Sequence, residues 1–330
     1  MVDFGKVDKQ TMNKLLVICG PTATGKTGLA VKLAKKFSSR GRPASGWNGE
    51  LISADSRQVY KEMDIGTGKD HPKEMKIHLI DVVAPNQEFS VAQYVELAWK
   101  AIKDIWKREK LPIIVGGTGF YIKSLIDGIE TLGILPNWEM RWRLKDLPAQ
   151  KLFEMLTQLD PEKAAQMNAS DRKNPRRLIR AIEIAKWKMD NGEQKKFSIL
   201  NSQFSILVVG LTAPYKILYQ RIDKRVEERI KEGVEDEIRG LLNKGYSFVY
   251  STLGVTIGYQ EWQPYFEGRA TQDEIIQRWK FAEHAYVRRQ MTWFKKDKRI
   301  NWFDINKKGW ENGVEKLIKN WYTRTDDKEN

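Results

Sequence analysis

The sequence predicts an α/β fold in which a mainly parallel sheet is flanked by helices and an all-helical domain is inserted. Over residues 1–128, short apolar runs alternate with amphipathic helical stretches, the pattern of strands joined by crossover helices. Over 129–199 the periodicity is helical and no convincing strand occurs, and an apolar run at 204–212 indicates that the sheet resumes. We therefore expect a discontinuous core of 1–128 and 200–305, a helical domain of 129–199, and a C-terminal tail of 306–330.

The first predicted strand, Leu15–Cys19, runs straight into a glycine-rich loop that is followed by a helical pattern. The loop reads G-x-x-x-x-G-K-T from Gly20 to Thr27, and strand, loop and helix together are the context of the phosphate loop of P-loop NTPases. Glycines let backbone N–H groups turn toward an anion, and the helix start adds its positive dipole end. Lys26 supplies a mobile charge, and the Thr27 hydroxyl suits Mg²⁺. The motif predicts a di- or triphosphate site formed by Gly20, Thr22, Ala23, Thr24, Gly25, Lys26 and Thr27.

An acidic residue follows the second predicted strand, Glu50–Ala54. Asp55 stands at the carboxyl end of this strand, and the carboxyl ends of parallel strands face the crevice in which open α/β sheets bind ligands. Asp55 is therefore a candidate general base or magnesium organiser beside the phosphate loop. The alternative is a structural aspartate that caps the next helix.

Two further strands are expected before the helical domain. His78–Val83 is predicted as the third strand, and Phe89–Lys107 as a long helix with one apolar face. Leu111–Val115 is predicted as the fourth strand, and it ends in the run Gly116–Tyr121. The two glycines and Thr118 of that run would place free N–H groups and a hydroxyl in the same crevice.

The helical domain and the helix that follows the fifth strand carry many arginines. The densest basic stretch is Asp171–Arg180, beside an apolar helix face. After the fifth strand, Pro214 opens what we expect to be one long helix to about Lys244. On it Arg221 and Arg225 are four residues apart and hence on one face, where two guanidiniums could grip a diphosphate. A solvated flank paired with neighbouring glutamates is the alternative, and helix geometry alone favours it.

The last third predicts a basic, aromatic helix that includes His284–Lys296, preceded by the segment Thr256–Gln260 and followed by a late strand at Asn301–Ile305. Arginines interleaved with flat rings suit unstacked RNA bases. A C-terminal core helix with a charged outer face is the alternative. The tail after about Lys307 has no pattern that predicts structure.

Composition narrows the function classes. The formal net charge is +14 and the pI is about 9.5. Such a charge indicates a polyanionic partner, of which nucleic acid is the first candidate; the alternative is a generally basic surface without such a partner. No apolar run approaches a membrane span and the N-terminus lacks a signal-peptide core, so we expect a cytoplasmic protein that does not enter a membrane. The single cysteine excludes an internal disulfide, and the three histidines do not cluster in the sequence, so we expect no metal site built from the protein alone.

Five stretches, in this order, resemble the tRNA dimethylallyltransferases, or isopentenyl-tRNA transferases. They are Gly20–Thr27, Asp55–Tyr60, Met63–Lys69, Gly116–Lys123 and Arg288–Phe294. The resemblance implies transfer of a dimethylallyl group from dimethylallyl diphosphate to the exocyclic N6 of the adenosine just 3′ of the tRNA anticodon. It also implies that the phosphate loop holds the isoprenoid's diphosphate rather than ATP, with Mg²⁺ as cofactor and the anticodon stem-loop of tRNA as partner.

The resemblance implies catalytic roles for single residues. Asp55 would take the N6 proton as the C–N bond forms, and Thr118 would hydrogen-bond near the bridging oxygen of the leaving diphosphate. Thr27, with Asp55, would help to hold Mg²⁺. Negative charge that develops on the diphosphate would be stabilised by Lys26, Arg221 and Arg225.

The resemblance also implies where tRNA is held, with the adenosine extruded from its loop. The adenosine would meet Ser56, Arg57 and Gln58, and Gln58 could read the adenine edge. The other positions that would contact tRNA are Arg141, Arg176, Arg177, Arg180, Gly258, Tyr259, Gln260, Arg288, Arg289, Gln290 and Trp293.

Three other functions remain open. An adenylate isopentenyltransferase acting on free nucleotide would share the phosphate loop and the aspartate, but it has less reason for an arginine-rich helical domain. A P-loop kinase or ATPase would centre its chemistry on a γ-phosphate. A non-catalytic RNA-binding protein would not need an intact Lys26, Thr27, Asp55 and Thr118. Under the favoured interpretation we expect a monomer.

Overall fold

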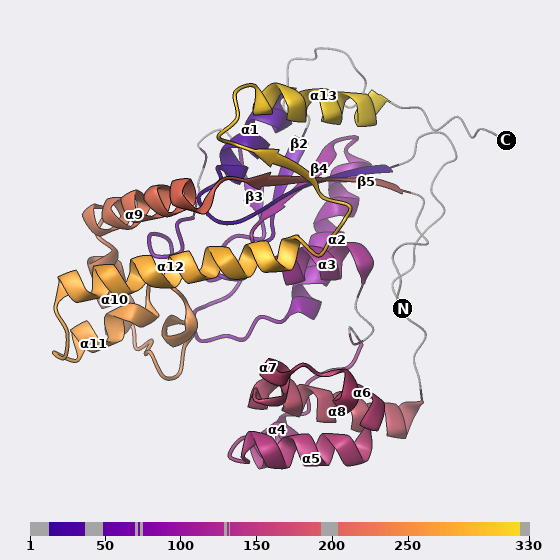
Figure 1. The fold of residues 1–330 in the computed structure, drawn as a ribbon, viewed down its shortest axis with the longest axis vertical. Coiled ribbons are helices and arrows are strands. Elements are labelled where there is room, and N and C mark those ends of the chain that lie inside the picture. Colours follow the sequence, from indigo (N-terminus) through magenta and orange to yellow (C-terminus); the bar gives the residue numbers. More distant parts are fainter. Residues whose placement is uncertain are drawn as a thin grey trace. The chain divides into compact units, whose positions relative to one another are not determined.

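The computed structural model describes residues 13–36, 49–69, 72, 75–128, 131, 133–192 and 204–323. They form two compact units, one from the described residues of 1–125 and 202–330, the other from those of 126–201. The first unit holds a sheet and the second is helical (Figure 1). No described helix is long and apolar enough to cross a membrane.

One six-stranded sheet lies at the centre of the first unit. Its strands are β1 (Asn13–Cys19), β2 (Gly49–Ser53), β3 (Ile77–His78), β4 (Leu111–Gly116), β5 (Phe204–Thr212) and β6 (Asn301–Asp304). The order across the sheet is β3-β2-β4-β1-β5-β6, and every pair is parallel. The central strands are nearly continuous apolar runs because helices cover both faces of a parallel sheet. The predicted α/β fold is thereby confirmed.

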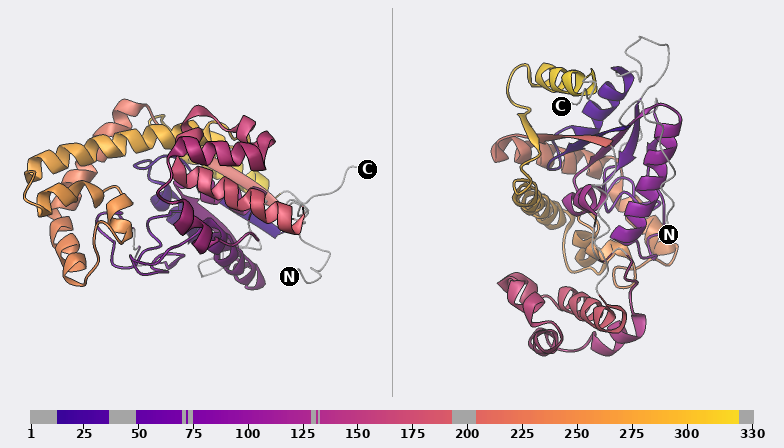
Figure 2. Two further views of the ribbon diagram at one scale, coloured as in Figure 1. Left: turned by 90° about the horizontal axis from the view of Figure 1, so that it is seen from below. Right: turned by 90° about the vertical axis from the view of Figure 1, so that its right-hand side faces the viewer.

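Helices pack on both faces of the sheet and beside it. Their bounds are α1 (Lys26–Lys36), α2 (Val91–Lys107), α3 (Gly119–Asp127), α9 (Tyr215–Lys231), α10 (Val234–Asn243), α11 (Gln263–Phe266), α12 (Gln272–Phe294) and α13 (Trp310–Thr323). Helices α1 and α13 cover one face, and α2 packs against β2 and β4 on the other (Figures 1 and 2). Helix α2 begins at Val91 because Ser90 and Gln93 form a capping box there.

The C-terminal segment is part of the core rather than the separate tail expected for 306–330. Helix α13 buries Val314 and Ile318 in one apolar cluster with residues of α1 and of strands β1 to β5. The Lys36 ammonium and the Glu315 carboxylate, 2.7 Å apart, join α1 to α13. The sequence prediction missed this helix because its few apolar residues are separated by polar ones.

The third strand is much shorter than the predicted His78–Val83, since β3 ends at His78. Leu79 and Asp81 have positive φ values of 64° and 58°, which a strand cannot accommodate. The Asp81 carboxylate is held by the buried Lys69 ammonium at 2.5 Å. The backbone thus leaves the sheet where this ion pair forms, although the apolar residues of 78–83 predict a strand there.

The single long helix expected from Pro214 to about Lys244 is two helices. Gly233, with φ of 92°, separates α9 from α10. Both helices turn an apolar face toward the interior. Ile222 and Val226 of α9 and Ile238 of α10 are buried in one cluster with residues of α12.

The second unit is wholly helical in its described residues. Its helices are α4 (Trp138–Leu144), α5 (Ala149–Leu159), α6 (Pro161–Gln166), α7 (Ala169–Arg172) and α8 (Pro175–Asn191). They close over a small apolar core that includes Leu152 and Leu156 of α5 and Leu178 and Ile182 of α8. Asn137, Asp160, Asn168 and Asn174 each cap the start of a helix with a side-chain oxygen.

Candidate active site

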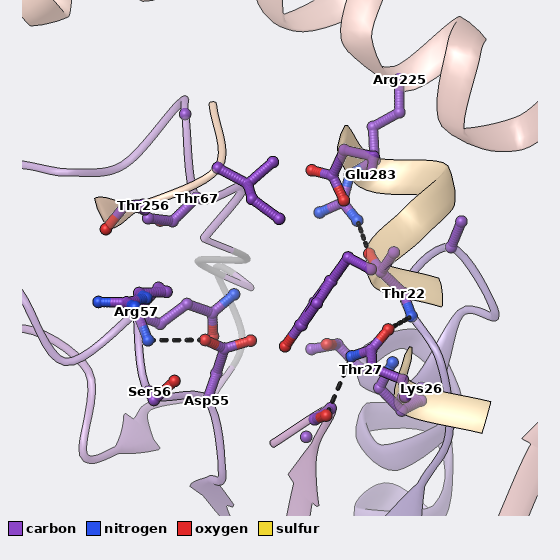
Figure 3. A pocket seen from close by; sticks show the side chains of 18 of the residues that line it. Thr22, Lys26, Thr27, Asp55, Ser56, Arg57, Thr67, Arg225, Thr256 and Glu283 are labelled. Atoms are coloured by element: carbon purple, nitrogen blue, oxygen red, sulfur yellow. Dashed lines mark hydrogen bonds between the residues drawn. The ribbon is translucent and has the colours of Figure 1, made fainter. Parts of the chain in front are cut away.

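The carboxyl ends of three neighbouring strands meet at a cavity of about 880 Å³ (Figure 3). Strand β1 leads into the phosphate loop, β2 leads to Asp55, and β4 leads to Gly116 and Gly117. Because the strands lie in the order β2-β4-β1, the phosphate loop and Asp55 stand on either side of β4. Residues of α9 and α12 complete the wall.

The backbone of the phosphate loop requires two glycines. Gly20 has φ of +135°, and a Cβ there would lie 2.3 Å from the Leu211 carbonyl oxygen of β5, so no other residue fits. Gly25 has φ of +79°, in the left-handed region that favours glycine. These two positions allow the loop to turn between β1 and α1 while lying against the neighbouring strand.

The phosphate loop is braced from within. The Thr24 hydroxyl and the Lys26 ammonium both donate to the Pro21 carbonyl, at 2.8 and 2.7 Å. Thr24 is buried, and neither it nor Gly20 lines the cavity, so these two predicted binding residues shape the loop from behind. The other predicted diphosphate-binding residues of the loop do line the cavity: Thr22, Ala23, Gly25, Lys26 and Thr27.

Asp55 and Thr118 are linked through Ser56. Asp55 Oδ1 accepts the N–H of Arg57 at 2.8 Å, which closes a tight turn after β2. Thr118 Oγ1 accepts the N–H of Ser56 at 3.0 Å and donates to Ser56 Oγ at 3.4 Å. One oxygen of Asp55, Oδ1, is thus used to hold the turn. The other, Oδ2, has no hydrogen-bond partner in the described part of the chain. Thr118 does not line the cavity but holds the Asp55 turn against β4.

A phenol of α12 contributes to the same corner. Tyr286 lines the cavity. The pKa of its hydroxyl is raised, mainly by burial and also by the nearby carboxylates of Asp55 and Glu283, although a hydrogen bond with Thr118 partly lowers it. The hydroxyl therefore stays protonated at neutral pH and is available as a donor. The sequence singled out Tyr286 only as one aromatic residue of the basic helix.

Two arginines of α9 face the phosphate loop. Arg225 Nη1 donates to Thr22 Oγ1 at 3.4 Å (Figure 3). Its Nη2 donates to the Gly68 carbonyl at 3.1 Å. Arg221 Nη2 lies 3.9 Å from the position that a Cβ on Gly25 would take. Both side chains line the cavity together with Lys26, so three cationic side chains are present there that could bind an anion.

The glutamates near these arginines are engaged elsewhere. Glu227 pairs with Lys280 of α12 at 2.7 Å, and Glu228 pairs with Lys224 at 3.6 Å. The alternative, in which Arg221 and Arg225 pair with Glu227 or Glu228 on a solvated flank, is therefore wrong about the ion pairs, although Arg221 is exposed as that alternative expects. The sequence could not distinguish a cavity-lining position of these arginines from a solvated one, because that depends on where α9 packs against the phosphate loop.

A buried ion pair in the cavity wall was not predicted. Arg229 of α9 and Glu283 of α12 are both buried, with Nη1 and Oε1 3.3 Å apart, and the guanidinium lies 5.7 Å from the Trp279 ring centroid. Burial, with the charge of Arg225, lowers the pKa of Arg229 to about 10, so it stays charged at neutral pH. The four-residue spacing that continues from Arg221 and Arg225 to Arg229 is the signal that could have revealed it.

The residues of the first unit that were expected to contact tRNA divide into exposed and buried ones. Tyr259 is fully buried, and its hydroxyl donates to Glu237 at 2.6 Å. Gly258 is a turn residue with φ of +92°, and a Cβ there would lie 2.6 Å from the Gly66 carbonyl oxygen. The available ones are Ser56, Arg57, Gln58, Gln260 and Arg289, which line the cavity, and Arg288 and Trp293, which are exposed on α12.

Gln290 lines the cavity and also holds two of its loops in place. Its Oε1 accepts the N–H of Thr22 and its Nε2 donates to the Gly117 carbonyl, each at 2.9 Å. The expectation that Tyr259 contacts tRNA is wrong because the residue is fully buried, whereas Gln290 lines the cavity with its amide bonded to two loops. Both side chains hold the loops that form the cavity.

The four arginines of the helical unit have different surroundings. Arg141 Nε lies 2.7 Å from Glu183 Oε1 and Arg180 Nη1 lies 2.9 Å from Glu183 Oε2, and Glu183 is buried. Burial alone would raise the pKa of Glu183, but the hydrogen bonds from both arginines outweigh it and lower the pKa. Arg141 and Arg180 thus tie helices together, whereas Arg176 and Arg177 are exposed on α8.

The fold and the cavity define a class of protein. It is a phosphate-loop α/β protein whose cavity is lined by cationic side chains that suit a di- or triphosphate and by the Asp55 carboxylate, of which one oxygen has no hydrogen-bond partner among the described residues. Such a site suits transfer of a group from a diphosphate to a nucleophile whose proton the carboxylate removes.

Comparison with known proteins gives the family. Residues 58–297 match the family model described as IPP transferase. The tRNA dimethylallyltransferases of Carboxydothermus hydrogenoformans and Roseiflexus castenholzii are 40% and 41% identical to the chain, covering 92% and 86% of it and 96% and 90% of their own lengths. The chain belongs to the IPP transferase family.

Solved structures agree with this assignment. A tRNA isopentenylpyrophosphate transferase from Bacillus halodurans has a TM-score of 0.67 and 34% identity, over 94% of this chain and 97% of its own. A eukaryotic dimethylallyltransferase acting on tRNA has a TM-score of 0.74 and 25% identity, over 96% and 81%. The same architecture therefore extends over nearly the whole chain.

Proposed function

We propose that this chain transfers a dimethylallyl group from dimethylallyl diphosphate to N6 of the adenosine 3′-adjacent to the anticodon in tRNA, releasing diphosphate. One observation carries the proposal: a phosphate loop with two arginines and a strand-end carboxylate with one open oxygen line the same cavity. The names of the relatives, which are tRNA dimethylallyltransferases, supply tRNA as the acceptor and dimethylallyl as the transferred group.

The chemistry assigns the charged groups of the cavity to two tasks. The adenine N6 forms a bond to C1 of the dimethylallyl group while the C1–O bond breaks, and the electron pair leaves with the diphosphate. Lys26, Arg221 and Arg225 stabilise the charge that develops on the leaving oxygens. The N6 proton passes to Asp55 Oδ2, which is the oxygen that the turn after β2 leaves open.

Recognition of tRNA is proposed to involve both units. Gln58 would read the adenine edge in the cavity, since a glutamine amide can bond an adenine bidentately. Exposed basic and aromatic residues would hold the anticodon stem-loop: Arg288, Arg289 and Trp293 in the first unit and Arg176 and Arg177 in the second. One monomer would supply all of these groups.

Mg²⁺ is proposed as the cofactor, and the residues present fit it. The Thr27 hydroxyl and the Asp55 carboxylate line the cavity that would hold the diphosphate, and Mg²⁺ prefers one or two protein oxygens together with phosphate oxygens and water. No group of three or more His, Cys, Asp or Glu side chains that could hold a metal occurs among the described residues. When bound, Mg²⁺ would neutralise charge on the diphosphate.

A transfer assay with two kinds of acceptor tests the proposal. The protein, Mg²⁺ and dimethylallyl diphosphate labelled in the dimethylallyl group are mixed with unmodified tRNA and, in parallel, with AMP or ATP. Label in tRNA alone is expected. Label in the free nucleotide would instead identify an adenylate isopentenyltransferase, and hydrolysis of ATP without transfer would identify a nucleotide-using P-loop enzyme.

A further inference from the structure

The loop Asp64–Lys69 forms part of the cavity wall, and the proposed function gives it no role. Gly66 and Thr67 of this loop line the cavity together with Gln58 and Arg225. Thr67 faces the cavity from the side opposite the phosphate loop (Figure 3). The contacts that fix the loop indicate which residue controls its position.

One carboxylate of α10 holds the start of the loop. Glu237 Oε2 accepts the N–H groups of Asp64 and Ile65 at 2.8 and 2.7 Å, and Oε1 accepts that of Gly66 at 3.1 Å. The Tyr259 hydroxyl donates to Oε1 as well, at 2.6 Å. Four donors therefore converge on Glu237, which is about the number that the lone pairs of a carboxylate accept.

The end of the loop is held by a buried lysine. The Lys69 side chain is fully buried, and its ammonium donates to the Tyr60 carbonyl at 2.6 Å and to the carboxylates of Asp64 and Asp81 at 2.6 and 2.5 Å. Gly66 packs against the Tyr259 ring so closely that a Cβ there would lie 2.4 Å from it. The backbone between these two anchors has little freedom to move.

The fixed loop presents one carbonyl to both halves of the cavity. The Gly68 oxygen accepts from Gln58 Nε2 at 3.2 Å and from Arg225 Nη2 at 3.1 Å. Arg225 also reaches Thr22 of the phosphate loop, at 3.4 Å. On the other side of the amide, Ser53 Oγ donates to Gln58 Oε1 at 3.3 Å. A hydrogen-bonded path thus joins the phosphate loop to the residue that would read the base.

We propose that Glu237 is a positioning residue which, through the Asp64–Lys69 loop, orients Gln58 and Arg225 together. A carbonyl can only accept, so the Gly68 oxygen requires the Nε2 side of the Gln58 amide and a guanidinium N–H of Arg225 to face it. This leaves one Nε2–H and one Oε1 lone pair of Gln58 for a base. The inference rests on the proposed function, because it assigns the base to Gln58 and the diphosphate to Arg225.

The first test compares Glu237→Gln with Asp236→Asn. Both remove one negative charge from the first turn of α10, but only Glu237 contacts the loop. A glutamine offers one acceptor oxygen and turns an NH₂ toward backbone N–H groups. We expect kcat/KM for transfer to tRNA to fall by roughly 10- to 100-fold, as for a displaced positioning group, with KM rising for both substrates. Asp236→Asn should stay within about twofold, as for a surface change.

The second test separates positioning from general stability. Glu237→Gln is repeated in a Gln58→Ala/Arg225→Ala background under single-turnover conditions. Since the oriented side chains are then absent, the added loss should be less than about twofold. The same loss in both backgrounds would overturn the proposal, as would equal activities of Glu237→Gln and Asp236→Asn.

A milder variant covers the case in which Glu237→Gln does not fold. Tyr259→Phe removes only the hydroxyl that donates to Glu237 Oε1, and it should lower kcat/KM in the same direction by about threefold or more, of the order of one lost hydrogen bond. Unchanged kinetics in this variant would then contradict the proposal. If the wild-type protein itself transfers no label to tRNA, the proposed function fails; if it does and the variants equal it, only the role of Glu237 fails.

Discussion

Replacing Gln290 by leucine should weaken both the fold and the binding of the diphosphate substrate. The Gln290 amide lies between two loops, accepting the N–H of Thr22 and donating to the Gly117 carbonyl, each at 2.9 Å. Gln290 is only 6% exposed, and a Cβ on Gly117 would lie 2.4 Å from its Nε2. One amide thus fastens the phosphate loop to the loop that follows β4.

The magnitude follows from the two backbone groups that the substitution leaves unpaired. Leucine has a similar volume but neither accepts nor donates, and each unsatisfied buried group costs roughly 1–3 kcal/mol. Because Thr22 is half-buried and water can replace part of its bond, we expect the free energy of unfolding to fall by about 2–4 kcal/mol. The KM for the diphosphate substrate should rise because Thr22 lines its cavity.

Urea unfolding followed by tryptophan fluorescence measures the first effect, and transfer kinetics measure the second. The matched control is Gln277→Leu, an exposed glutamine on the same helix, for which a change of less than about 0.5 kcal/mol is expected. Equal unfolding free energies for the two variants would refute the reasoning, since they would mean that the buried amide contributes no more than a surface one.

Two further predictions concern charged groups away from the catalytic centre. The Arg108 guanidinium, with burial opposing it, lowers the pKa of Glu50, so this carboxylate stabilises the fold above its unfolded pKa of about 4.3 and the stabilisation is lost as the pH falls below that value. Urea unfolding of Glu50→Gln should therefore show a weaker pH dependence than wild type between about pH 5 and pH 2, and identical profiles would contradict it. Replacing the exposed Arg176 and Arg177 together by alanine should weaken tRNA binding. It should also reduce the steepness of the plot of log affinity against log salt concentration by about 1–2, and an unchanged slope would contradict this prediction.

Much of the fold follows from the sequence because strand and helix periodicities are local. The central strands agree with prediction to within about two residues, and the mainly parallel sheet and the helical unit are confirmed. The misses have non-local causes. Strand β3 stops where Lys69 and Asp81 pair, and α13 is held by apolar residues of α1 and the sheet. The break at Gly233 is the exception, because a glycine at this point of the sequence could have indicated it.

The candidate site divides in the same way. Its loops could be predicted because each follows a strand, and parallel strands end at one edge of the sheet. The side chains that face the cavity could not be predicted, because their orientation depends on residues that are distant in sequence and pack against them in the fold. Arg141 and Arg180 resemble tRNA contacts in sequence but bind the buried Glu183, and Tyr259 is buried against the Asp64–Lys69 loop. A basic residue thus indicates an RNA contact only if no buried acid binds it.

The measurement that tests the central claim most directly is a single-turnover transfer of labelled dimethylallyl to tRNA by Asp55→Ala, with tRNA affinity measured on the same preparation. Asp55 is proposed to take the N6 proton, and loss of a general base typically slows a reaction by about 10²–10⁴-fold. We predict this decrease in rate for Asp55→Ala, with tRNA binding nearly unchanged. For the wild-type protein we predict that the label is found on N6 of the adenosine beside the anticodon. Transfer at the wild-type rate, or equal losses of rate and binding, would contradict the account.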